Sequence, residues 1–136
     1  MIQKLPLYFL LLFLLSCQQA EKKAPVTDID VATAFIRNVL DNDFKGAEQF
    51  LLKDDTNQRL FVRFQKQYQE KDKTELNKYK VADIIINGYE NLNDTLTIVN
   101  YSNSYKADNK TKIKVVRTLG KWQVDFKYTY IENMQP

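Results

Sequence analysis

The spacing of apolar residues changes once along this chain, from a helical period to a strand period, at about residue 78. Before that point apolar side chains recur at intervals of three and four residues, which indicates amphipathic helices. After it they alternate with polar side chains, which indicates half-buried strands. Helices grouped before strands are typical of the α+β class. The sequence therefore predicts a single α+β domain over residues 27–136, without an internal repeat.

Three helices are expected in the first half of this domain, because clusters of turn-forming residues at 41–43 and 54–57 interrupt the helical period. Thr27 and Asp28 can cap the first helix. The three apolar stripes consist of Val31, Phe35, Val39 and Leu40, of Phe44, Ala47, Phe50 and Leu51, and of Leu60, Phe61, Phe64 and Tyr68. The third stripe fades into the charged stretch 69–73.

Four strands joined by short turns are expected in the second half. Their ranges are about 81–86, 95–105, 111–119 and 122–130, with turns at 91–94, at 106–110 and at Gly120. Short connections imply antiparallel pairing of neighbouring strands. The last strand would place an aromatic row on one face, packed against the helices. That row consists of Trp122, Phe126, Tyr128 and Tyr130, with Val124 between them.

The first sixteen residues have the pattern of a signal peptide. Lys4 precedes an apolar run of eleven residues, 5–15. A membrane-spanning helix needs about 20 residues, whereas the apolar region of a signal peptide has roughly 7–15. Ser16 offers the small residue that a signal peptidase requires. Cys17 follows it as the only cysteine of the chain, so it cannot form an internal disulfide.

Residues 14–17, Leu-Leu-Ser-Cys, resemble the lipobox of bacterial lipoproteins. The resemblance implies cleavage between Ser16 and Cys17 and acylation of Cys17, which becomes the first mature residue. Several acyl chains would then hold the protein on a bilayer, since one chain alone binds only marginally. Residues 17–26 would form a flexible tether. The expected location is the bacterial cell envelope, with the outer membrane favoured and the side of the membrane left open.

The first amphipathic helix ends in Leu40-Asp41-Asn42-Asp43-Phe44, with Ala47 three residues further on, and residues 120–124, Gly-Lys-Trp-Gln-Val, form the last turn and the start of the last strand. These features resemble small bacterial lipoproteins of unknown function with a nuclear transport factor 2-like, or cystatin-like, domain. The resemblance covers about residues 28–131. It implies three N-terminal helices packed on a curved four-stranded antiparallel sheet that forms a cone. It supplies no catalytic residues.

Composition excludes several kinds of site. Histidine is absent and only three glycines occur, so His-based catalysis, the common zinc sites and Gly-rich phosphate loops are excluded. Residues 41–46 imitate the start of a calcium loop, but Lys45 and Leu52 stand where ligands are needed. A helix junction with Asp43 as the cap is expected there instead. Neither a metal nor a cofactor is therefore expected.

Charge gives little support for a nucleic-acid partner. The formal net charge is only +3. A group of lysines surrounds the third predicted strand and is expected to form a solvated face that discourages edge pairing. These are Lys106, Lys110, Lys112, Lys114 and Lys121. The expected partners are the lipid bilayer, through Cys17, and either an envelope protein or a small ligand.

Two main functions are open on the sequence, and a structural role in an envelope assembly is a third possibility. The first is a lipid-anchored, non-catalytic module that binds a ligand or a protein. The alternative is a small cavity enzyme of the isomerase or hydrolase type, using a buried Asp and Tyr. The residues that could line such a cavity are Asp83, Asn100, Tyr101 and Tyr128, although solvent-facing or rim positions are expected for them. A cone filled by its own aromatic side chains would favour a protein-binding module.

Overall fold

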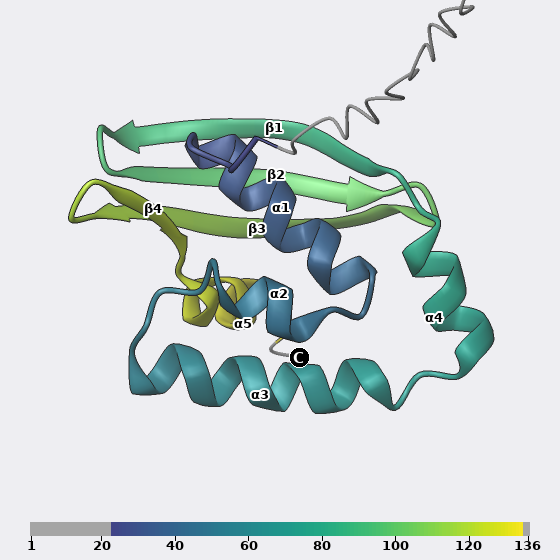
Figure 1. The fold of residues 1–136 in the computed structure, drawn as a ribbon. Coiled ribbons are helices and arrows are strands. Elements are labelled where there is room, and N and C mark those ends of the chain that lie inside the picture. The colour runs from purple at the N-terminus through teal and green to yellow at the C-terminus, as the bar shows by residue number, and fades with distance from the viewer. Residues whose placement is uncertain (1–22, 135–136) are drawn as a thin grey trace, which may run out of the picture.

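The computed structural model describes residues 23–134, which form five helices and one four-stranded sheet (Figure 1). The helices are α1 (Asp28–Leu40), α2 (Phe44–Glu48), α3 (Asp55–Gln69), α4 (Lys73–Lys80) and α5 (Phe126–Met134). The strands are β1 (Ile84–Asn93), β2 (Leu96–Asn103), β3 (Lys106–Thr118) and β4 (Lys121–Val124). The α+β class and the four-stranded antiparallel sheet are confirmed. Ser16 and Cys17, with the whole predicted signal peptide, lie outside the described residues.

The starts of α1, α2 and α3 are set by polar side chains. Thr27, Asp43 and Asp54 each accept a hydrogen bond from the backbone N–H three residues ahead, at 3.1, 2.9 and 2.8 Å. These bonds satisfy N–H groups that lack a partner within the helix. α1 and α3 carry the first and third predicted stripes, whereas α2 covers Phe44 and Ala47 and ends before Phe50 and Leu51. Asp43 caps α2, as the sequence predicts. None of the helices in residues 23–134 has the length and apolar character to cross a membrane.

α3 ends in the charged stretch 69–73, as predicted, and an additional helix, α4, follows from Lys73. Asp72 caps it by accepting from the N–H of Glu75 at 2.8 Å. Tyr79 is the only buried residue among its eight, so no apolar stripe marks it in the sequence. Four helices, and not the three expected, therefore precede the sheet. Arg37 of α1 ties α4 to the domain, because its guanidinium donates to the carbonyls of Lys80 and Ala82 at 2.9 and 2.7 Å.

The strands follow one another in sequence order, β1-β2-β3-β4. Two of them are longer than predicted. β1 runs on to Asn93, and the stretch 106–110, expected as a turn, is the first part of β3. In both extensions nearly every residue is exposed. Without one buried face these segments carry no alternation of apolar and polar residues that could mark them as strands.

The prediction that the aromatic row lies along the last strand is wrong, because β4 ends at Val124 and α5 begins at Phe126. Phe126 and Thr129 are buried and Tyr130 is partly buried. Positions 126, 129 and 130 are spaced three and four apart, as on one face of a helix. The same aromatic residues also happen to alternate with polar ones, which is why a strand was expected. Of the predicted row only Trp122 lies on a strand.

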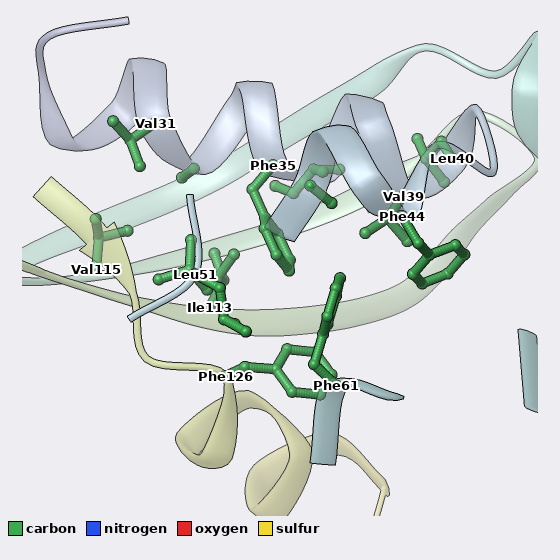
Figure 2. Close-up of a cluster of buried hydrophobic side chains, with 14 of the residues drawn as sticks. Val31, Phe35, Val39, Leu40, Phe44, Leu51, Phe61, Ile113, Val115 and Phe126 are labelled. Carbon is green, nitrogen blue, oxygen red and sulfur yellow. The ribbon is translucent and has the colours of Figure 1, made fainter. Parts of the chain in front are cut away.

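The space between the helices and the sheet is filled by side chains. Figure 2 shows Phe35 of α1, Phe61 of α3 and Phe126 of α5 gathered beside Ile113 of β3, with Val115 set apart from them. The ring centroids of Phe61 and Phe126 lie 5.3 Å apart, and those of Phe35 and Phe61 lie 5.7 Å apart. Such tilted and edge-on contacts are favourable geometries for aromatic pairs. The core is therefore an aromatic cluster rather than an enclosed cavity.

Candidate functional site

The sheet has two edges, and β4 forms one of them. Leu51, in the segment between α2 and α3, pairs with Val124 as a single parallel bridge. The N–H of Val124 donates to the carbonyl of Phe50 at 2.7 Å, and the N–H of Leu52 donates to the carbonyl of Val124 at 2.8 Å. The outer side of β4 is therefore occupied at Val124, the last residue of the strand.

Beyond the end of β4, α5 takes over the protection of β3. The N–H of Asp125 donates to the carbonyl of Lys114 at 2.9 Å. Eight residues further along the chain, the side-chain amide of Asn133 accepts from the N–H of Lys112 at 3.0 Å and donates to its carbonyl at 2.9 Å. A side-chain amide offers the same donor and acceptor as a peptide group. Asn133 therefore extends the pairing of β3 to Lys112, as another strand would at that position.

A buried carboxylate holds the start of α5 in place. Asp125 is 4% exposed. Its Oδ2 lies 3.3 Å from Nζ of Lys114, and its Oδ1 lies 3.5 Å from Nζ of Lys127. Oδ1 also accepts from the amide of Asn57 at 3.3 Å. Both carboxylate oxygens are thus engaged by protein groups, an arrangement that stabilises the junction of α3, β3 and α5.

Asp54 extends this network to the cap of α3. Its Oδ2 lies 3.3 Å from Nζ of Lys127 and accepts from the amide of Asn57 at 2.8 Å. The backbone N–H of Asn57, with the Lys127 ammonium beside it, lowers the pKa of Asp54. Partial burial opposes the charge of Lys127, yet the carboxylates of Asp125 and Asp54 raise its pKa. Both shifts favour the charged pair at neutral pH.

The other edge of the sheet, β1, is open. No strand and no backbone group among residues 23–134 pairs with its outer side. Nine of its ten residues are exposed. They include four large apolar side chains, Ile85, Ile86, Tyr89 and Leu92. The sequence of β1, IIINGYENLN, contains no lysine, arginine or proline, which are the residues that usually protect a free edge.

Two bulges divide β1 into short regular stretches. The register with β2 shifts between Ile86 and Gly88 and again between Asn91 and Asn93. Residues 88–91 lie between these shifts and pair regularly with residues 97–100. A segment added to this edge would therefore find a straight stretch of only a few residues. The bulges limit uncontrolled pairing but leave the backbone groups accessible.

A shallow hollow, here called the outer-face groove, lies beside this stretch on the side of the sheet away from α1. It has a volume of about 360 Å³ and is lined by Glu90 of β1, Asn100 of β2, Lys112 of β3 and Tyr128 of α5, among others. The Lys114 ammonium lies 5.6 Å from the ring centroid of Tyr128. The groove thus offers a carboxylate, an amide, a phenol and a cation next to the open edge.

Two of the four candidate cavity residues, Asn100 and Tyr128, meet in this groove. The other two lie elsewhere. Tyr101, the neighbour of Asn100 along β2, packs against the core on the opposite face, and burial raises its pKa to about 12. Asp83 is exposed ahead of β1, where its N–H and carbonyl both bond Ser104, each at 2.9 Å. The structure therefore does not gather the four into one site.

Sequence reasoning missed the open edge as a site. Its apolar side chains are visible in the sequence, but whether a strand lies at an edge depends on the order of strands in the sheet. The one available signal was the absence of lysine, arginine and proline from β1, in contrast with the lysine-rich β3. Comparisons with known protein families, with curated proteins and with solved structures found no match.

Proposed function

We propose that this protein is a lipid-anchored protein of the bacterial cell envelope that binds an extended segment of a second envelope protein along β1. The open edge of β1 is the observation that carries this proposal. Strand addition to a free edge uses main-chain hydrogen bonds for affinity and neighbouring side-chain pockets for specificity. The exposed N–H and carbonyl groups of β1 supply the first, and the outer-face groove supplies the second.

The regular stretch 88–91 sets the register of the bound segment. Glu90 and Lys112 place one charge of each sign in the adjacent groove. We expect side chains of the bound segment to point alternately to the two faces of the sheet. One of those on the groove side should be polar or charged and should contact Glu90 or Lys112. The exposed Tyr89 and Leu92 offer apolar contact on either side of it.

The anchor rests on the sequence Leu-Leu-Ser-Cys at residues 14–17. Acylation of Cys17 would hold the domain at the bilayer without a membrane-spanning segment. Intact-mass analysis of the membrane fraction should find a mature chain that begins at an acylated Cys17. Cys17→Ala should release the protein from membranes or block its processing. A membrane-bound chain that retains Met1 and carries no lipid would contradict the anchor.

The filled core supports a protein-binding module over a cavity enzyme. The space expected to form a cone interior holds the Phe35, Phe61 and Phe126 rings. The buried carboxylate Asp125 is engaged by two lysines and by Asn57. A nuclear transport factor 2-like arrangement remains part of the proposal, supported by helices that precede an antiparallel sheet and by α1, which crosses that sheet (Figure 1).

Site-specific photocrosslinking in intact cells tests strand binding. A photoreactive residue in place of Leu92 should give one discrete protein adduct. The same residue in place of Val62, an equally exposed apolar side chain on α3, should give none. A lysine in place of Tyr89 should abolish the Leu92 adduct while the protein stays folded. Equal adducts at positions 92 and 62, or an adduct that survives Tyr89→Lys, would contradict binding along β1.

A further inference from the structure

The turn between β3 and β4 places an apolar side chain in an unusual conformation. Leu119 has a φ of 50° and is followed by Gly120 at 74°. Two consecutive residues with positive φ suit Asn-Gly, whereas a bulky aliphatic side chain in this region is an outlier that costs stability. Leu119 is also completely exposed. An apolar residue kept in a costly conformation and directed into solvent indicates a function outside the folded domain.

The side chains around Leu119 form an amphipathic tip, here called the β3–β4 tip (residues 117–122). Arg117 and Lys121 are exposed, and Trp122 is half-buried behind them. The Arg117 guanidinium lies 5.9 Å from the ring centroid of Trp122. Trp and basic side chains beside an exposed aliphatic residue are the combination found where proteins meet the headgroup region of a bilayer.

The last residues of the N-terminal tether lie beside this tip. Residues 24–26 share one hollow with Arg117, Lys121 and Trp122, and no carboxylate lines that hollow. Val26, at the end of the tether, is itself exposed. The hollow on the tip side of the tether is therefore apolar and basic, which complements an anionic lipid surface, whereas Asp30 and Asp41 line a second hollow beside the tether.

The length of the tether brings this surface close to the membrane. This step rests on the proposed acylation of Cys17. Lys23 is the sixth residue after Cys17, and a fully extended chain covers about 3.3–3.6 Å per residue, so the distance between the two is about 22 Å at most. The tether residues beside the tip, and hence the tip, must therefore lie near the lipid headgroups.

We propose that the β3–β4 tip docks on the bilayer. Leu119 enters the headgroup region, Trp122 lies at the interface, and Arg117 and Lys121 contact anionic lipid phosphates. Docking holds the domain in one orientation on its anchor, so that the lipid tether and the tip form two contacts with the same surface. Because Leu119 serves this contact, its unfavourable backbone conformation is retained.

Trp122 is the only tryptophan of the chain and therefore reports on the tip directly. The chain beginning at Cys17 keeps every described residue, and its single cysteine can be coupled to a maleimide lipid in vesicles. Vesicles of phosphatidylcholine with phosphatidylglycerol, both with brominated acyl chains, should quench Trp122 strongly. Lys121→Gln should reduce partitioning of the uncoupled chain onto the same vesicles about fivefold. Vesicles of phosphatidylcholine alone should give weaker quenching.

Leu119→Asn separates docking from folding. Asparagine suits the positive φ at this position, so the variant should melt at a higher temperature than the parent and yet lose most of the quenching. Val81→Asn, at an exposed apolar position outside the tip, should leave the quenching unchanged. Coupled protein whose Trp122 is not quenched, or quenching that Leu119→Asn leaves intact, would overturn the inference.

Because the lipid is coupled to Cys17 chemically, the quenching of Trp122 does not depend on natural acylation of Cys17. Membrane-extracted protein that lacks lipid on Cys17 would refute the anchor, and quenching of the coupled chain would still measure docking. A Trp122 emission that shifts with protein concentration in the absence of vesicles would assign the tip to a second copy of this chain. That outcome would also overturn docking on lipid.

Discussion

The two edges of the sheet differ in whether their outer backbone groups are paired. On the β4 side, a parallel bridge from Leu51, the backbone of Asp125 and the side chain of Asn133 each occupy backbone groups that would otherwise be free. On the β1 side, ten residues have no partner on their outer side within residues 23–134. The difference shows that this fold has effective means of closing an edge and that β1 is left open in spite of them. An open edge beside a closed one is therefore better explained as a binding surface than as incomplete packing.

The largest expected effect comes from breaking the closed edge at its anchor. Phe126→Ala removes a side chain that is 1% exposed and packs on the Phe61 ring. Large-to-small changes of buried Phe cost about 3–5 kcal/mol, out of the roughly 5–15 kcal/mol that stabilises a domain. Urea unfolding followed by circular dichroism measures this loss.

Ile131→Ala is the matched control on the same helix, because Ile131 is largely exposed. Its free energy of unfolding should change by no more than about 0.5 kcal/mol. If both variants unfold at the same urea concentration, α5 does not secure the edge through Phe126.

A smaller effect is expected where α5 imitates a strand. Asn133→Ala removes two hydrogen bonds to Lys112. Each hydrogen bond contributes a net of about 0.5–1.5 kcal/mol to stability, so the free energy of unfolding should fall by about 1–3 kcal/mol. Hydrogen exchange at the Lys112 amide should accelerate, because its N–H loses its acceptor. Glu132→Ala leaves these bonds in place and serves as the control. Unchanged exchange at Lys112 would show that Asn133 does not close the edge.

The charged network at the start of α5 makes the closed edge sensitive to pH. Asp54→Ala removes the cap of α3 and a partner of Lys127, and loss of a cap costs about 0.5–2 kcal/mol. Because folding lowers the pKa of Asp54, its contribution is present above the unfolded value of about 3.9 and is lost as pH falls through the folded value.

The stability difference between wild type and Asp54→Ala should accordingly be largest near neutral pH and shrink in acid. Thermal melts over a pH series measure it. Asp72→Ala removes the corresponding cap of α4, which lies away from the closed edge. A difference between wild type and Asp54→Ala that stays constant with pH would show that the charge of Asp54 does not contribute.

The smallest effect is expected at the open edge. Tyr89→Ala removes a side chain that is 62% exposed. The free energy of unfolding should change by about 0.5 kcal/mol or less, since substitutions of exposed residues rarely have a larger effect on stability. Partner crosslinking at β1 should nevertheless fall, which would sharpen the contrast between an edge that stabilises and an edge that binds. A loss of stability comparable to that of Phe126→Ala would remove the contrast.

Elements with one buried face were predictable from the sequence. α1 carries Val31, Phe35 and Val39 on such a face, and Thr27 marks its start. α4, with Tyr79 as its only buried residue, leaves no periodic signal. The outer parts of β1 and β3 are exposed throughout and leave none either. Periodicity reports burial, so elements that extend beyond the core cannot be recognised from it.

The candidate site was harder to predict from the sequence, for a different reason. Asn100 and Tyr128 meet in the outer-face groove only because α5 lies against β3. The aromatic spacing of residues 126–130 fitted a strand as well as a helix, so this arrangement could not be inferred. The edge position of β1 is a property of the sheet as a whole. Both depend on contacts between segments far apart in the chain.

The covering of β3 by Asn133 also fixes how many neighbours the sheet can accept. A sheet with two free edges has a valence of two, and strand addition on both sides propagates into open-ended fibres. Here the side chain of Asn133 occupies the backbone of Lys112 beyond the end of β4, so no strand can be added at that position. Two copies of such a sheet that pair through their β1 edges leave no β1 edge free for a third copy. The helix that covers β3 therefore favours a closed pair over an open-ended fibre.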